Sequence, residues 1–152
     1  MRISLKVVIC ASILLVVGSL AFAGFAKPED AIRYRQAVMT VLGQHFGNIV
    51  AVLQGQAPYD KDKLEHDAMV VRTMADLPWD AALDPGSYKG NTTLKPLVLK
   101  EKTKFMAIAR RLESTTKKLA QTAKSGDLKA IGEQFGKVAE NCKTCHSTFR
   151  KS

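Results

Sequence analysis

Apolar residues recur from residue 28 to residue 149 at intervals of three, four and seven, which is the spacing of one face of an α-helix. No strand-like alternation persists in this stretch. The pattern predicts four amphipathic helices. Their apolar stripes read Ile32, Met39, Phe46 and Leu53 in the first; Leu64, Val71, Met74 and Leu77 in the second; Val98, Phe105, Leu112 and Leu119 in the third; and Leu128, Phe135, Cys142 and Phe149 in the fourth.

Capping and breaking residues set the limits of the first two helices. Pro28 suits the first turn of the first helix, and Gly55 and Pro58 end it. Asp60 is the expected cap of the second helix, because its carboxylate can accept from the free N–H groups there. Pro78 stops that helix.

The second half of the chain contains a long connection and a short one. Residues 78–96 hold three prolines and two glycines and predict a long loop in which nothing fixes one path. A tight turn at residues 125–127 separates the third and fourth helices, and Asp127 caps the fourth. Four such helices pack as an antiparallel up-down-up-down bundle, so we predict an all-α four-helix bundle.

The first 23 residues have the layout of a secretory signal peptide. Arg2 and Lys6 precede an apolar run over residues 7–20, and Ala21-Phe22-Ala23 supplies a cleavage site. The alternative is a retained membrane anchor, for which the apolar run is short of the roughly 20 residues that a span needs. We expect cleavage after Ala23, a domain over residues 24–152, and a periplasmic protein with no membrane attachment.

Composition agrees with one basic globular domain. The 152 residues include 23 Lys and Arg against 14 Asp and Glu, for a formal charge of +9, and 46% are hydrophobic. This apolar share is too high for a disordered chain. Of the three cysteines, Cys10 lies in the predicted signal peptide, which leaves Cys142 and Cys145. In an oxidising compartment such a pair closes into a disulfide unless another group uses its sulfurs.

Residues 142–146 read Cys-Lys-Thr-Cys-His, the C-x-x-C-H signature of c-type haem attachment. On a helix, positions i, i+3 and i+4 share one face. Two thiols on that face can form thioethers to the two vinyl groups of one porphyrin, and the next histidine can ligate the iron. The sequence therefore predicts one covalently bound haem c, held by Cys142 and Cys145, with His146 as an iron ligand.

A structural zinc site and a thioredoxin-like redox pair are the two alternatives for this cluster. A structural zinc site needs a fourth ligand, and the remaining histidines, His45 and His66, lie singly on the first two helices. We expect these two to be solvent-facing or hydrogen-bonded rim residues rather than ligands. A thioredoxin-like redox pair needs a βαβ setting with the cysteines at a helix N-terminus, which this pattern lacks.

The chain resembles the class II cytochromes c, the cytochrome c prime family, over essentially all of residues 24–152. Most small cytochromes c carry the attachment motif near the N-terminus, whereas here it closes a four-helix pattern. The resemblance rests on Lys27-Pro28-Glu29-Asp30-Ala31, Tyr34-Arg35-Gln36, Gly55-Gln56-Ala57-Pro58-Tyr59-Asp60, Leu77-Pro78-Trp79, and Cys142 to His146 with Arg150 and Lys151. It implies an exported bacterial haem protein, often homodimeric, that transfers electrons or binds nitric oxide or carbon monoxide.

The resemblance also implies roles for single residues. Cys142 and Cys145 hold the haem and His146 is the proximal ligand. Arg35 and Gln36 match positions that contact the haem propionates, and a guanidinium pairs well with carboxylates; the alternative for both is a solvated helix face. Thr92 matches a polar contact from the long loop, although Leu97-Val98-Leu99 departs from the family pattern there.

Met39 falls at the family position that faces the iron opposite the histidine, and two readings stay open. Its thioether ligates the iron, giving a six-coordinate, low-spin electron carrier. Alternatively, Met39 packs over an open position and leaves five-coordinate iron for a gas ligand. We favour ligation, because a thioether is a ready iron ligand.

A one-electron carrier is therefore the expected function, with a gas-binding protein as the alternative. A haem-free helical adaptor would require the pentapeptide to be accidental. No acid–base pair, nucleophile triad or phosphate loop is present, so no enzyme is expected. The positive charge suits an acidic redox partner, while nucleic-acid binding does not fit an exported protein.

Overall fold

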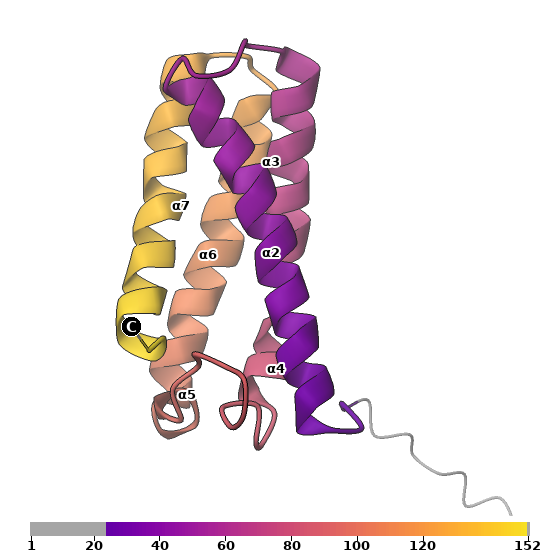
Figure 1. Ribbon diagram of the computed structural model, residues 1–152. Helices are drawn as coiled ribbons and strands as arrows, with labels where there is room; N and C mark the ends of the chain where they lie inside the picture. The colour runs from indigo at the N-terminus through magenta and orange to yellow at the C-terminus, as the bar shows by residue number, and fades with distance from the viewer. Residues whose placement is uncertain (1–23, 152) are drawn as a thin grey trace, which may run out of the picture.

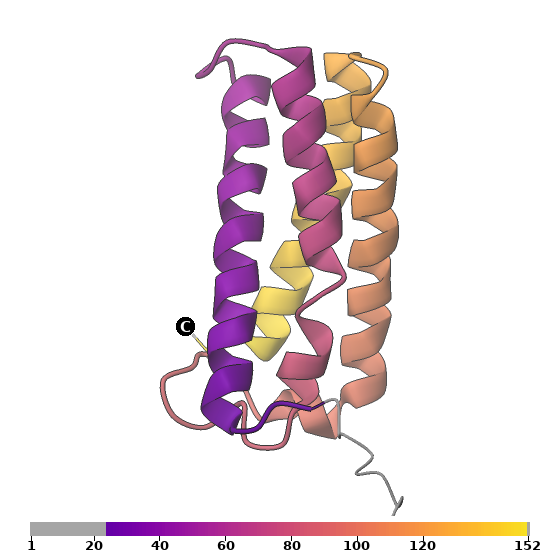
Figure 2. The same cartoon turned by 90° about the vertical axis from the view of Figure 1, so that its right-hand side faces the viewer.

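The computed structural model describes residues 24–151 as a bundle of four long helices (Figure 1). The predicted signal peptide, residues 1–23, lies outside the described residues. The helices are α2 (Pro28–Leu53), α3 (Lys61–Ala75), α4 (Trp79–Leu83), α5 (Leu97–Lys100), α6 (Lys102–Ala123) and α7 (Leu128–Phe149). The long helices alternate in direction, and Figures 1 and 2 show the α2–α3 and α6–α7 connections at one end. The predicted antiparallel bundle is confirmed.

The caps expected from the sequence are formed. Asp60 accepts a hydrogen bond from the Lys63 backbone N–H at 3.1 Å, and Asp127 accepts from Lys129 and Ala130 at 2.9 and 3.2 Å. Gly126, in the turn before α7, has a φ of 71°, and its carbonyl accepts from the Tyr59 hydroxyl at 3.2 Å. A side chain there would be strained by that φ and crowded against the Tyr59 oxygen, so this turn requires glycine.

Two expectations about the middle of the chain need correction. Residues 78–96 are not a loop throughout, because Trp79–Leu83 forms α4. The third helix is also broken: α5 ends at Lys100, and Glu101, with φ −110° and ψ 40°, separates it from α6. Burial explains both, since Trp79, Ala81, Ala82 and Val98 all pack into the core, and helices this short depend on such packing.

The rest of the loop follows one defined path along the end of α7. The Lys95 N–H donates to the Phe149 carbonyl and the Lys151 N–H to the Thr93 carbonyl, each at 2.8 Å. Leu94 and Arg150 form an isolated antiparallel bridge between these bonds. This backbone pairing fixes the loop, which the sequence pattern alone does not.

The four long helices do not pack equally on all sides. Close backbone contacts join α2 to α3, α3 to α6, and α6 to α7, while α2 and α7 make few or none. At the end nearest the interhelix turns, α2 and α7 still meet through the stacked rings of Phe46 and Phe135, 4.2 Å apart. Below that contact the fourth side of the bundle separates, and the residues of the haem motif lie there.

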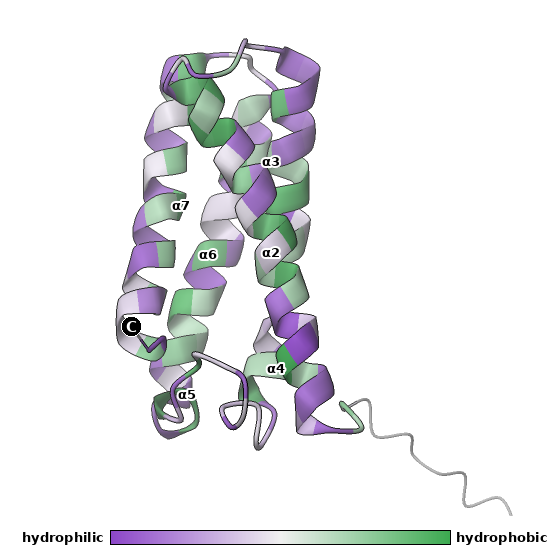
Figure 3. Ribbon diagram, viewed as in Figure 1, coloured by the Kyte–Doolittle hydropathy of each residue, from purple (hydrophilic) through white to green (hydrophobic). Residues whose placement is uncertain are grey.

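Helix α2 is apolar on more than its core side. Among residues 24–151 it is the one helix long and apolar enough to cross a membrane by length and composition. Figure 3 shows hydrophobic residues on the side of α2 that faces the viewer. Tyr34 and Val41 on α2 and Met69 on α3 are each about two-fifths exposed. The apolarity of α2 thus reflects two faces, one inward and one outward.

Candidate haem site

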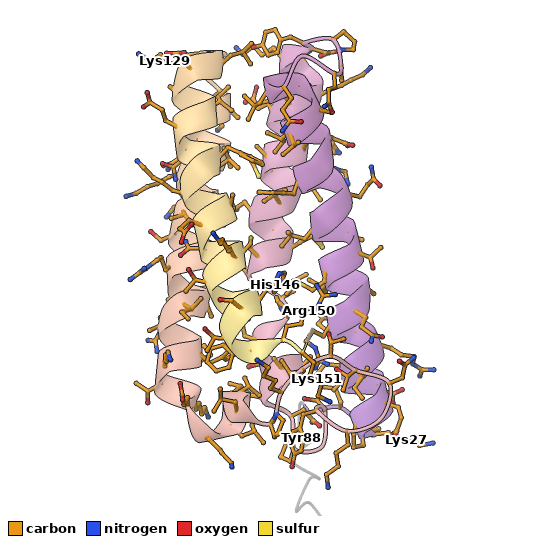
Figure 4. All side chains as sticks on the ribbon, turned by 60° about the vertical axis from the view of Figure 1, so that its left-hand side comes forward. Lys27, Tyr88, Lys129, His146, Arg150 and Lys151 are labelled. Atoms are coloured by element: carbon orange, nitrogen blue, oxygen red, sulfur yellow. The ribbon has the colours of Figure 1, made fainter. Side chains whose placement is uncertain are left out.

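The haem-motif residues share one face in the last third of α7. Cys142, Cys145 and His146 line one cavity, as the predicted i, i+3, i+4 spacing requires. Figure 4 shows His146 and Arg150 on the side of α7 that faces α2. The helix therefore presents both thiols and the imidazole to the same space.

Both thiols are free and half-buried. Burial raises the pKa of Cys142, and burial together with the neighbouring Cys142 raises the pKa of Cys145 to about 11. Both groups are therefore neutral thiols at physiological pH. Desolvation, aided by the positive charge of Arg150, lowers the pKa of His146. A neutral imidazole is the form that ligates iron.

The cavity lies between α2 and α7, with walls from α4, α6 and the loop. Its volume is about 600 Å³, within the range of cofactor sites. Its lining is mainly apolar and comprises Arg35, Gln36, Met39, Thr40, Leu42, Gly43, Phe46, Pro78, Trp79, Ala82, Thr92, Thr93, Leu94, Phe105, Ile108, Leu112, Asn141, Cys142, Cys145, His146, Phe149 and Arg150. Every site residue expected from the sequence is in this set.

Met39 lines the cavity from α2, while His146 lines it from α7. The Met39 side chain is only partly buried. Leu42 and Phe46 line the same wall of the cavity one and two turns further along α2. The structure therefore brings the predicted sixth-position residue and the predicted proximal histidine to the same space from different helices.

Arg35 is buried, with 7% of its surface exposed, so it does not belong to a solvated helix face. Its guanidinium donates to the carbonyls of Ala81 and Ser87, both at 3.1 Å, and to the Thr92 hydroxyl at 2.7 Å. Burial lowers the pKa of Arg35, although a guanidinium remains charged. Arg35 thus joins α2 to the end of α4 and to the loop.

Gln36 is exposed but also contacts the loop. Its side-chain amide donates to the Asn91 carbonyl at 3.0 Å, next to the Arg35–Thr92 contact. The Thr92 hydroxyl in turn accepts from the Leu94 N–H at 3.1 Å. The three residues expected at the propionates therefore form one cluster at the cavity wall, linked through the loop backbone.

Trp79 provides a test of whether a haem fits this space. Trp79 lines the cavity, and its indole Nε1–H is buried and has no hydrogen-bond partner among the described residues. Its ring packs edge-on against Phe105, which packs edge-on against Phe149. A buried unpaired donor is unfavourable by roughly 1–3 kcal/mol, and a propionate carboxylate is an acceptor of the right kind. Together with two free thiols and an imidazole, this donor fits a haem c.

Asn141 is a cavity residue that the sequence did not single out. It is buried, and its side-chain amide donates to the Thr115 hydroxyl of α6 at 3.0 Å, which fixes α7 against α6 one residue before Cys142. Arg150 likewise lines the cavity. It lies four residues after His146, just beyond the end of α7, and the sequence points to it only as part of the family resemblance.

Comparison with known proteins identifies relatives over the same region. The family model described as "Cytochrome C'" matches residues 30–150. The cytochromes c prime of Alcaligenes xylosoxydans and Rubrivivax gelatinosus are 38% and 37% identical over 127 and 128 residues, in each case 84% of this chain and 98% of the relative.

Solved structures agree with this similarity. Cytochrome c prime from Shewanella frigidimarina has a TM-score of 0.82 at 30% identity, covering 85% of this chain and 100% of that one. A nitric oxide complex of a variant of cytochrome c prime from Alcaligenes xylosoxidans has a TM-score of 0.78 at 37% identity, covering 84% of this chain and 98% of that one.

Proposed function

Because this chain belongs to the cytochrome c prime family, whose members bind one covalently attached haem c, we propose that it binds nitric oxide at a haem held in the cavity that Met39 lines. Cys142 and Cys145 would carry the haem through two thioethers, and His146 would be the proximal ligand. When bound, the haem supplies an iron that accepts small gas ligands and changes oxidation state. The protein supplies ligation, burial and a selective distal pocket.

The observation that carries this proposal is the character of the α2 wall. Met39, Leu42 and Phe46 are apolar. The polar side chains of α2 there direct hydrogen bonds to the chain itself, Arg35 and Gln36 to the loop and Thr40 to the Gln36 carbonyl at 2.9 Å. An α2 wall whose polar side chains bond within the chain suits neutral nitric oxide or carbon monoxide better than bound dioxygen, which hydrogen bonding stabilises. The nitric oxide complexes of related proteins support this reading.

A one-electron carrier is the second candidate, and Met39 is the observation that favours it. A thioether that lines the same cavity as His146 can supply the sixth iron ligand and raise the reduction potential. The basic residues of α5 and α6 would then attract an acidic redox partner. They are Lys100, Lys102, Lys104, Arg110, Arg111, Lys117 and Lys118.

Absorption spectroscopy of the haem-loaded protein separates the two candidates. A gas-binding protein has a high-spin ferric spectrum, and its ferrous form binds one equivalent of nitric oxide. Replacing Met39 with Ala leaves that spin state unchanged. A Met39-ligated carrier has a low-spin spectrum that M39A converts to high-spin. Gln44→Ala, at an exposed position of the same helix outside the cavity, is the matched control. Ferrous wild-type protein that takes up no nitric oxide at equimolar concentration would rule out the leading proposal.

Location and assembly complete the proposal. We propose export to the periplasm with cleavage after Ala23, and a binding or electron-transfer role rather than an enzymatic one. We also propose a homodimer. The exposed apolar residues Tyr34, Val41 and Met69 support it, because α2 and α3 pair side by side and leave these side chains to solvent in the monomer.

A further inference from the structure

Away from the haem cavity, three side chains with ligand atoms meet between α2 and α3. His45 comes from α2, and His66 and Asp67 come from α3. The two imidazole rings lie with their centres 5.8 Å apart and their planes inclined at 66°. The chain has three histidines in all, so this pair contains both of those outside the haem motif.

Asp67 determines how the His45 ring is presented. This carboxylate is buried, and its Oδ1 contacts His45 Nδ1 at 2.5 Å and accepts from the Asn48 amide at 3.1 Å. An ionised carboxylate only accepts hydrogen bonds, so Nδ1 of His45 must carry the proton. In the neutral ring the free electron pair is then on Nε2, on the side of the ring away from Asp67.

A carboxylate bonded to one nitrogen of an imidazole while the other binds a metal is a recurrent arrangement in metalloproteins. It fixes the tautomer, orients the ring and raises its basicity. Asp67 and His45 have this relationship. Among the described residues, no other carboxylate forms a hydrogen bond with the partly buried His45 ring or with the exposed His66 ring.

The spacing of the two rings suits a shared ion. With a metal–nitrogen distance of about 2.0–2.1 Å, two imidazoles on one ion place their ring centres roughly 5–6 Å apart, depending on the angle at the metal. The observed 5.8 Å lies in that range. Because His66 is exposed, its side chain can also adjust without disturbing the core.

We propose that His45 and His66 form an open binding site for a late divalent transition-metal ion, Cu²⁺ or Zn²⁺, with Asp67 positioning His45. Among residues 24–151 no group of three His, Cys, Asp or Glu residues is arranged as a metal site, so the protein offers two ligands and water would supply the others. Two imidazoles select Cu²⁺ and Zn²⁺ over Mg²⁺ and Ca²⁺, which take oxygen ligands. Cu²⁺ binds more tightly than Zn²⁺, following the general order for such ligands.

Calorimetric titration of the haem-loaded, chelator-treated protein, purified without an affinity tag, tests the site. ZnCl₂ and CuCl₂ are each expected to bind at one equivalent per chain, Cu²⁺ with the higher affinity, while MgCl₂ gives no heat of binding. Replacing the exposed His66 with Ala should weaken Zn²⁺ binding at least about tenfold. Thr73→Ala, exposed on α3 two turns beyond His66, is the matched control and should leave binding unchanged.

Asp67→Asn tests the positioning role separately. The amide can no longer fix the His45 tautomer, so Zn²⁺ affinity should fall about 10- to 100-fold while the two imidazole ligands remain. Binding that is unchanged in His66→Ala would overturn the proposal, as would a protein that binds neither metal. Because His66 is exposed, its replacement does not unfold the protein, so weaker Zn²⁺ binding in His66→Ala reports the loss of a ligand.

Discussion

The Arg35 guanidinium and the Thr92 hydroxyl are 2.7 Å apart although 57 positions separate them in the chain. The same guanidinium also holds the carbonyls of Ala81 and Ser87. One side chain of α2 therefore fixes both α4 and the loop at the mouth of the haem cavity. A residue expected to contact a propionate is thus also a structural anchor of the cavity wall.

Replacing Arg35 with Leu should lower the free energy of unfolding by about 3 kcal/mol, because two buried carbonyls lose a charged donor. Thr92→Val removes the bonds that the hydroxyl accepts from Arg35 and from the Leu94 N–H but leaves both carbonyl bonds of Arg35, so it should lower the free energy of unfolding by about 1–2 kcal/mol. Denaturant unfolding of the haem-loaded proteins followed by circular dichroism measures both values. An Arg35→Leu protein as stable as the Thr92→Val protein would contradict the anchoring role.

Trp79→Phe should distinguish the haem-loaded protein from the apoprotein. In the loaded protein the substitution removes a donor to a propionate and should lower the free energy of unfolding by about 1 kcal/mol. In the apoprotein the donor has no partner, so the change should be near zero or slightly stabilising. Parallel unfolding curves of both forms provide the test. Equal losses in the two forms would mean that the indole N–H does not bond to the haem.

Cysteine variants should separate the two attachment points. Cys142→Ala and Cys145→Ala each leave one thiol beside His146, so each protein should retain covalent haem through a single thioether. The double variant should lose all its haem on extraction with acidified acetone. Mass spectrometry of the denatured chains reads the attached group directly. Haem that stays bound to the denatured double variant would contradict attachment at these residues.

The raised pKa of Cys145 has a consequence for the apoprotein in alkali. Folded protein holds the thiol proton up to a pH of about 11, whereas an unfolded chain releases it near 9.0. The folded state therefore binds more protons in this window, and its stability should fall as the pH rises from 9 to 11. Cys145→Ala should remove that part of the slope. Thermal unfolding of the reduced apoprotein between pH 8 and 11 measures it.

Much of the fold could be predicted because its long helices repeat an apolar stripe and begin at recognisable caps. The short helix α4 and the break at Glu101 could not be, since tertiary packing of Trp79 and Val98 stabilises them and no periodicity encodes it. Breaker residues predict the irregular chain over residues 84–96 but carry no information about its backbone pairing with residues 149–151.

The sequence likewise predicts some residues of the haem site and not others. Cys142, Cys145 and His146 are contiguous in sequence, so their motif predicts them together. Arg35 donates a hydrogen bond to a loop carbonyl, and Trp79 carries an indole N–H without a partner. Neither feature can be predicted from residue types or their spacing. The sequence predicts that His45 is either solvent-facing or hydrogen-bonded at the rim. In the structure it forms a hydrogen bond with Asp67.

The bundle has three protein-packed sides, and the fourth, between α2 and α7, converges only at Phe46 and Phe135. A covalently bound haem would therefore complete this side of the bundle. Newly made polypeptide that never receives its porphyrin keeps that side accessible to proteases. The abundance of this protein in a cell should accordingly follow iron supply, even when its messenger RNA does not change.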